Sequence, residues 1–108
     1  MITINIKRND KNEIVKFSLD GHAGFAKSGN DIVCAAVSAI TNMIIIGFEK
    51  LKIMPDFEKN DDGYLSFELP NNLTEEQNSK VQYLLDCMLE EFMDIQRNYS
   101  KYVKVKEI

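Results

Sequence analysis

The sequence predicts an α+β domain in which one layer of strands packs against two helices, with the order β-β-α-β-β-α-β. Two observations predict this fold class. Several short segments alternate apolar and polar residues, which is the period of a half-buried strand. Two longer segments, over 32–53 and after Thr74, have the length and apolar spacing of helices. We expect the central helix to be largely buried, whereas the strand order does not follow from these patterns.

The chain begins with a predicted hairpin. Residues 2–7 alternate isoleucine with polar residues, and residues 15–19 alternate large apolar residues with polar ones. The polar cluster over 9–12 favours a turn between them. Asp20-Gly21 ends the second strand, and a loop begins at His22.

The central helix is predicted from Ile32 to about Ile53 and is apolar almost all round. Asp31 stands at the expected N-cap, where its carboxylate can accept a hydrogen bond from a helix-end N–H. Met54-Pro55 breaks the helix. Because a chain of 108 residues offers little to wrap such a helix, we expect a homodimer to cover part of it.

A second hairpin and a second helix follow. The turn at 60–63 separates a short strand over 57–59 from an alternating strand over 65–69. Thr74 and Gln77 have the spacing of a capping box, and the helix after them carries its apolar residues on one face. A last short strand is expected over 103–106.

Composition and charge indicate which kinds of protein this chain can be. With 44% hydrophobic and 28% charged residues, the chain fits one globular domain over 1–108 with a modest core. A net charge of −4 argues against a protein that coats nucleic acid and is compatible with a basic partner. The first ten residues turn polar by residue 7, so no signal peptide is predicted, and polar residues interrupt the apolar run over 32–48, so no membrane span is expected. We therefore predict reduced cysteines and a cytoplasmic protein.

Cys34 is the candidate nucleophile. With Asp31 as N-cap it is the third helical residue, where the partial positive charge of the helix end favours a thiolate. The single histidine, His22, lies just upstream and is the candidate general base and acid. The backbone N–H groups of Cys34 and Ala35, expected to be unpaired in the first turn, are candidate oxyanion donors. These parts together are those of acyl-transfer chemistry.

The neighbouring residues leave alternatives open. Asp31 either caps the helix only or also orients His22. Ser38 lies at i+4 from Cys34, and its hydroxyl bonds either the sulfur or a backbone carbonyl. Cys87 lies mid-helix, far from any histidine in the sequence, and is interpreted as structural. One histidine and two distant cysteines do not make a zinc site, so no metal or other cofactor is expected.

The runs Gly21-His22-Ala23 and 31–38 (DIVCAAVS) closely resemble the ribosomal-processing cysteine protease family, Prp (YsxB-like). The resemblance extends over nearly the whole chain. It implies a homodimeric α+β cysteine protease that removes a short N-terminal extension from the large-subunit ribosomal protein L twenty-seven. It also implies that Cys34 is the nucleophile, that His22 is the general base and that Asp31 assists them.

The resemblance further implies an apolar cleft, because the family's substrates carry aromatic residues at the cut. Phe25, Ile32 and apolar residues of the central helix are the candidate walls. Gly21, directly before His22, and Gly24 and Gly29, between the two reactive residues, predict a mobile loop that closes over the peptide and assembles the pair.

Two other functions stay open at this stage. One is a non-catalytic module that binds a peptide during ribosome assembly on the same scaffold. Peptide binding without turnover would favour it. The other is a thiol redox domain, which would require Cys87 as the resolving partner of Cys34. A reversible disulfide between these cysteines would favour it.

Overall fold

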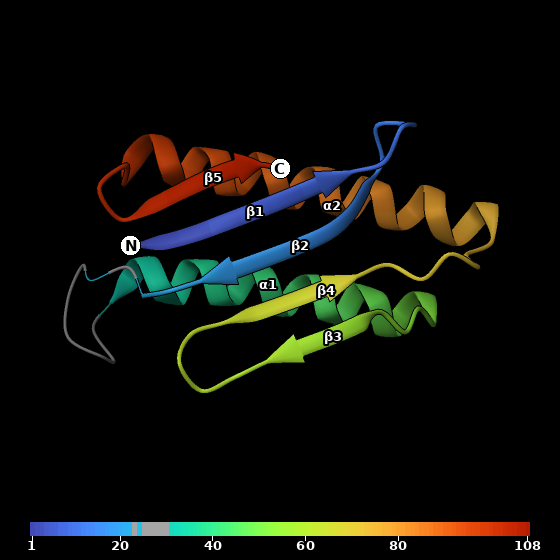
Figure 1. Ribbon diagram of the computed structural model, residues 1–108, viewed down its shortest axis with the longest axis horizontal. Coiled ribbons are helices and arrows are strands. Elements are labelled where there is room, and N and C mark those ends of the chain that lie inside the picture. The colour runs from blue at the N-terminus through green and yellow to red at the C-terminus, as the bar shows by residue number, and fades with distance from the viewer. Residues whose placement is uncertain (23, 25–30) are drawn as a thin grey trace.

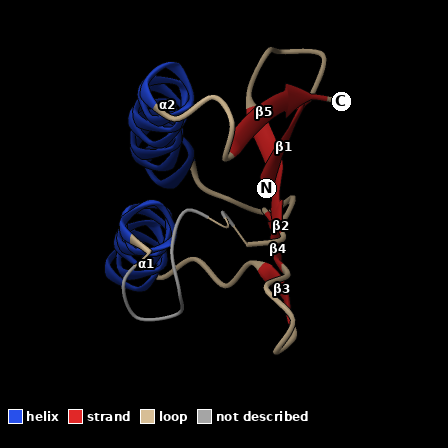
Figure 2. Ribbon diagram, turned by 90° about the vertical axis from the view of Figure 1, so that its left-hand side faces the viewer, coloured by secondary structure: helices blue, strands red, loops and turns tan. Residues whose placement is uncertain are grey.

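Five strands form one sheet, and both helices lie on the same face of it (Figures 1 and 2). The computed structural model describes residues 1–22, 24 and 31–108. The elements follow in the order β1 (Ile2–Arg8), β2 (Ile14–Asp20), α1 (Ile32–Leu51), β3 (Asp56–Lys59), β4 (Leu65–Glu68), α2 (Glu75–Asn98) and β5 (Val103–Glu107). The predicted α+β class and element order are confirmed.

The strand order across the sheet is β3-β4-β2-β1-β5. β1 pairs antiparallel with β2 and parallel with β5, while β4 pairs antiparallel with both β2 and β3. The parallel pair joins the two ends of the chain, because α2 crosses over the sheet and returns β5 beside β1. The second hairpin extends the other side of the sheet, so that β3 lies at one edge and β5 at the other.

Four phenylalanines hold the two layers together. Phe17 of β2 stacks on Phe67 of β4 with ring centroids 4.9 Å apart, and on Phe92 of α2 at 5.7 Å. Phe48 of α1 meets the edge of Phe67 at 4.8 Å. All four are buried. Because this cluster contacts both helices and two central strands, it fixes each helix against the same part of the sheet.

α1 buries one face only. Val33, Val37 and Ile44 lie in the core, whereas Met43 and Ile46 are 52% and 51% exposed. The expectation of a largely buried helix therefore holds for the face on the sheet, because α2 covers only part of the remainder in a single chain. By length and composition alone, α1 has 20 residues with a mean hydropathy of 1.9 and passes as a membrane span. A core helix passes the same test, and the buried face of α1 agrees with that alternative.

α1 ends at Leu51, two residues earlier than predicted. Lys52 adopts a left-handed conformation with φ 58°, and its N–H donates to the carbonyls of Glu49 and Phe48. The N–H of Ile53 also donates to Phe48 O, at 2.9 Å. This closing turn ends the helix before Met54-Pro55.

Candidate active site

Asp31 caps α1 and fixes the backbone of Cys34. One carboxylate oxygen, Oδ1, accepts from the N–H of Val33 at 3.0 Å and from that of Cys34 at 2.9 Å. The predicted N-cap is confirmed, and Cys34 is the third residue of the helix and half-buried. The same carboxylate places a negative charge at the helix end, which offsets part of the positive charge expected to favour a thiolate.

The prediction that the amides of Cys34 and Ala35 are unpaired is wrong. The Cys34 N–H donates to Oδ1 of Asp31, and the Ala35 N–H donates to the Asp31 carbonyl at 3.1 Å. The Cys34 N–H is one of the first amides of a helix, which usually lack an intrahelical partner, whereas the Ala35 N–H makes the first ordinary i to i−4 bond of the helix. Here one residue satisfies both, through its side chain and its backbone. These two groups are therefore not a ready oxyanion site in this conformation.

His22 directly follows the end of β2, and its side chain is exposed. Its carbonyl accepts from the amino group of Met1 at 2.6 Å. The preceding Gly21 has a φ of 99°, and a methyl group there would collide with the carbonyl oxygen of Met1. The Gly21 N–H donates to the carbonyl of Gly63 at 3.1 Å. Contacts on both sides thus fix the backbone that leads into the histidine.

The structure brings His22 and Cys34 to the same end of the molecule. In Figure 1 the last residues of β2 and the first turn of α1 both lie at the left-hand end. Each residue is placed by a rigid element, one by a central strand and the other by the capped helix. A half-buried thiol and an exposed imidazole at one end of the fold are suited to nucleophilic acyl transfer.

The comparisons with known proteins agree with this arrangement. A family model described as cysteine protease Prp matches residues 1–104. The chain belongs to the Prp family. The ribosomal processing cysteine protease Prp of Bacillus subtilis (strain 168) is 36% identical over 111 residues, which cover 97% of this chain and 96% of that protein.

Two crystal structures of the essential ribosomal processing protease Prp from S. aureus have the same fold. One, in complex with a covalently linked product peptide, matches with a TM-score of 0.88 and 27% identity. The other, in complex with a substrate peptide, matches with a TM-score of 0.82 and 26% identity. Both matches cover all of this chain and all of the solved chain. The chain is therefore a cysteine protease, and the predicted family and fold are confirmed.

Three other residues predicted for this site, Ser38, Ile32 and Gly24, are exposed at the surface. Ser38 lies one turn beyond Cys34 and is exposed, and Ile32, the first residue of α1, is 54% exposed. Gly24 is exposed with a φ of 71°, and a methyl group there would contact no atom of the described residues within 4 Å. Gly29 of the predicted loop and Phe25 of the predicted cleft lie outside the described residues.

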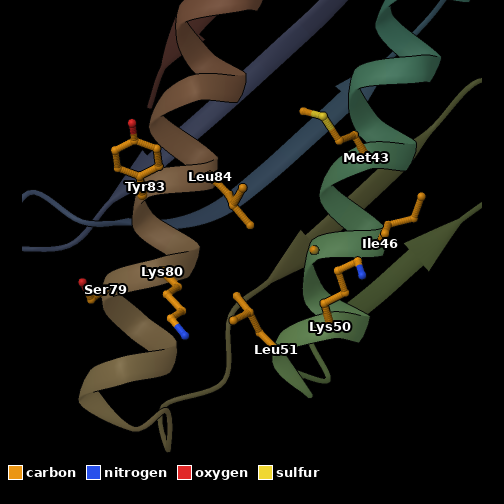
Figure 3. A pocket seen from close by; sticks show the side chains of 9 residues that line it. Met43, Ile46, Lys50, Leu51, Ser79, Lys80, Tyr83 and Leu84 are labelled. Atoms are coloured by element: carbon orange, nitrogen blue, oxygen red, sulfur yellow. The ribbon is translucent and has the colours of Figure 1, made fainter.

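An apolar groove of about 650 Å³ lies between α1 and α2, but not at Cys34. Figure 3 shows the side chains that line it. Its nearest α1 residue, Met43, is nine residues beyond Cys34, which is about 14 Å along the helix. The groove is therefore distinct from the cleft predicted beside the nucleophile.

The second cysteine, Cys87, lies on α2 and not at the start of α1. Cys87 is exposed on α2, so it does not fill the core, and no disulfide joins it to Cys34. Within residues 1–22, 24 and 31–108, no group of three or more histidine, cysteine or acidic side chains is arranged to hold a metal ion.

Sequence reasoning missed one neighbour of His22. Gly63, in the turn between β3 and β4, lies against the imidazole ring. The sequence signalled only a turn there, and nothing local connected that turn to the histidine.

Proposed function

We propose that this chain removes a short N-terminal extension from the ribosomal protein L twenty-seven, with Cys34 as nucleophile and His22 as general base and acid. The observation that carries the proposal is the placement of Cys34 in the first turn of α1, at the same end of the fold as His22. Family membership and the peptide-bound structures of the S. aureus protein support the same assignment.

The reaction follows from these two side chains. His22 takes the thiol proton of Cys34, and the sulfur forms a bond to the carbonyl carbon of the scissile peptide bond. The carbon–nitrogen bond then breaks, and the protonated imidazole gives its proton to the leaving amine. Water hydrolyses the resulting thioester with His22 as base, which restores the thiol. The covalently linked product peptide of the S. aureus protein is consistent with a covalent route.

We also propose a homodimer that works in the cytoplasm as a single protease domain over 1–108. The groove between α1 and α2 supports the dimer, since Met43, Ile46 and Tyr83 expose apolar surface there and Tyr83 is 73% exposed. The net charge of −4 suits a basic ribosomal protein as substrate. Ile46→Asp is expected to shift the chain from dimer to monomer in sedimentation equilibrium. An unchanged dimer would contradict this interface.

A cleavage assay tests the proposed protease. The substrate is a peptide that copies the aromatic-containing N-terminal extension, and cleavage is followed by mass spectrometry. Wild type and Cys87→Ala are expected to cleave it, whereas Cys34→Ala and His22→Ala are expected to lose activity. Circular dichroism checks that each variant folds. Tight binding of the peptide by wild type without cleavage would favour the peptide-binding module instead.

A further inference from the structure

Gly63 touches the side chain proposed as the general base. A methyl group at Gly63 would lie 3.0 Å from Nε2 and 3.1 Å from Cε1 of His22. The imidazole edge therefore occupies the space that a side chain at position 63 would need. Gly63 also has a φ of 86°, a left-handed conformation that favours glycine.

The backbone of Gly21, directly before His22, also contacts Gly63. The Gly21 N–H donates to Gly63 O at 3.1 Å, and a methyl group at Gly63 would lie 2.9 Å from Gly21 O. Antiparallel pairing of β2 with β4 brings the two glycines together, because Leu19 pairs with Leu65 and the same register, continued by two positions, places residue 21 opposite residue 63. The sheet register thus sets the contact.

The turn that carries Gly63 is itself held in shape. The Asn60 side-chain oxygen accepts from the N–H of Asp62 at 2.9 Å and from that of Tyr64 at 3.2 Å. The Asn60 N–H donates to Tyr64 O at 3.1 Å. A turn with this bonding resists displacement, so it can act as a fixed support for a neighbouring ring.

We propose that Gly63 is a positioning residue that sets the orientation of the His22 imidazole, so that the β3–β4 turn forms part of the active site. The inference rests on the proposed role of His22 in the proposed function. The missing side chain is what allows the ring to lie against the turn. A ring displaced by an added methyl group would no longer meet the Cys34 thiol in the same geometry.

Gly63→Ala tests the inference, with Asn12→Ala as the matched control. Asn12 is also in a left-handed conformation, with φ 65°, in the turn between β1 and β2 at the other end of the sheet. Both variants place alanine in a strained hairpin turn, but only the first adds an atom beside His22. Gly63→Ala is expected to lower kcat about 10- to 100-fold with a smaller change in KM, and Asn12→Ala to leave both unchanged.

A double variant shows whether the effect passes through His22. In the His22→Ala background, Gly63→Ala is expected to change the residual rate less than about twofold, because the ring it displaces is absent. An equal loss in both backgrounds would overturn the inference. A loss of the same size in Asn12→Ala would also overturn it.

Nuclear magnetic resonance separates this inference from the proposed function. His22 is the only histidine of the chain, so its ring Hε1 proton gives one assignable signal. An NOE from this proton to the Gly63 Hα protons is expected in wild type, and Gly63→Ala is expected to shift the signal. The wild-type NOE requires neither catalysis nor a variant. Absence of the NOE would overturn the positioning role of Gly63, even if His22 proves essential for cleavage. An observed NOE together with a fully active His22→Ala variant would instead overturn the proposed role of His22 in catalysis.

Discussion

Both helices begin with an N-cap residue whose side chain accepts from helix-end N–H groups, but their third residues differ. α2 begins with a closed capping box, in which the Thr74 hydroxyl accepts from the Gln77 N–H at 3.0 Å and the Gln77 side chain accepts from the Thr74 N–H at 2.9 Å. α1 has Asp31 at the equivalent cap and Cys34 at the position that Gln77 occupies in α2. The cap of α1 therefore reaches its third residue through the backbone N–H of Cys34, which donates to Asp31 Oδ1 at 2.9 Å.

The two first turns also differ in charge. In α2 the third side chain is committed to the cap, and Glu75 and Glu76 add negative charge in the first turn. In α1 the first turn carries no acidic residue, and Asp31 alone provides the cap. The start of α2 is thus capped reciprocally by two side chains, whereas the start of α1 is capped by the Asp31 carboxylate and has the proposed nucleophile at its third position.

The largest expected effect separates the third positions of the two helices. Cys34→Ala is expected to lower kcat/KM by several powers of ten and to leave the folded state intact, because it removes the proposed nucleophile. Gln77→Ala is expected to do the reverse, with unchanged kcat/KM and about 1 kcal/mol less stability from the opened cap. Peptide cleavage and urea unfolding measure both quantities. Similar activity losses in the two variants would remove the distinction between the helix starts.

A smaller effect separates the two cap residues. Asp31→Ala and Thr74→Ala are each expected to lose about 1 kcal/mol of stability, because each leaves helix-end N–H groups without a partner. Only Asp31→Ala is expected to slow cleavage as well, roughly tenfold, because the Cys34 backbone is no longer fixed.

Asp31→Asn sharpens this comparison. Asparagine keeps an oxygen that accepts hydrogen bonds but has no charge, so it is expected to retain the stability and to keep cleavage within a few-fold of wild type. Cleavage as slow as in Asp31→Ala would instead show that the carboxylate charge acts on His22.

The smallest expected effect is on the stability of the protein at acidic pH. The Lys80 ammonium, 2.8 Å from the carboxylate, holds the pKa of Glu76 below its ordinary value of 4.5, first by hydrogen bonding and then by its charge. Because the folded-state pKa is lowered, the contribution of Glu76 is fully present above pH 4.5 and is lost as pH falls through the lowered pKa. Urea unfolding at pH 6 and pH 3 is expected to show a smaller acid loss in Glu76→Gln than in wild type. Equal losses would contradict a stabilising charge at the start of α2.

Local patterns predicted most of the fold, because strand alternation and helix caps are properties of neighbouring residues. Both caps, Asp31 and Thr74, were found in this way. The parallel pairing of β5 with β1 was not, since it depends on how α2 crosses the sheet. The end of α1 at Leu51 was not predicted either, because Lys52 adopts a left-handed conformation that is unusual for lysine.

The site was predictable only in part, for a related reason. His22, Cys34 and Asp31 lie within one short stretch, so their association was visible in the sequence. The contact of His22 with Gly63 joins distant segments through the register of β2 with β4, which no local pattern encodes. The pairing of the Cys34 amide depends on the side-chain geometry of Asp31, whereas the Ala35 amide donates to the backbone carbonyl of Asp31.

The most direct test of the nucleophile uses a peptidyl chloromethyl ketone with the sequence of the substrate extension. Tryptic peptides of the labelled protein are analysed by mass spectrometry while residual cleavage is followed. We expect one label per chain, on Cys34, with activity falling in proportion to labelling. Inactivation with the label on Cys87, or full activity with Cys34 completely labelled, would contradict the assignment.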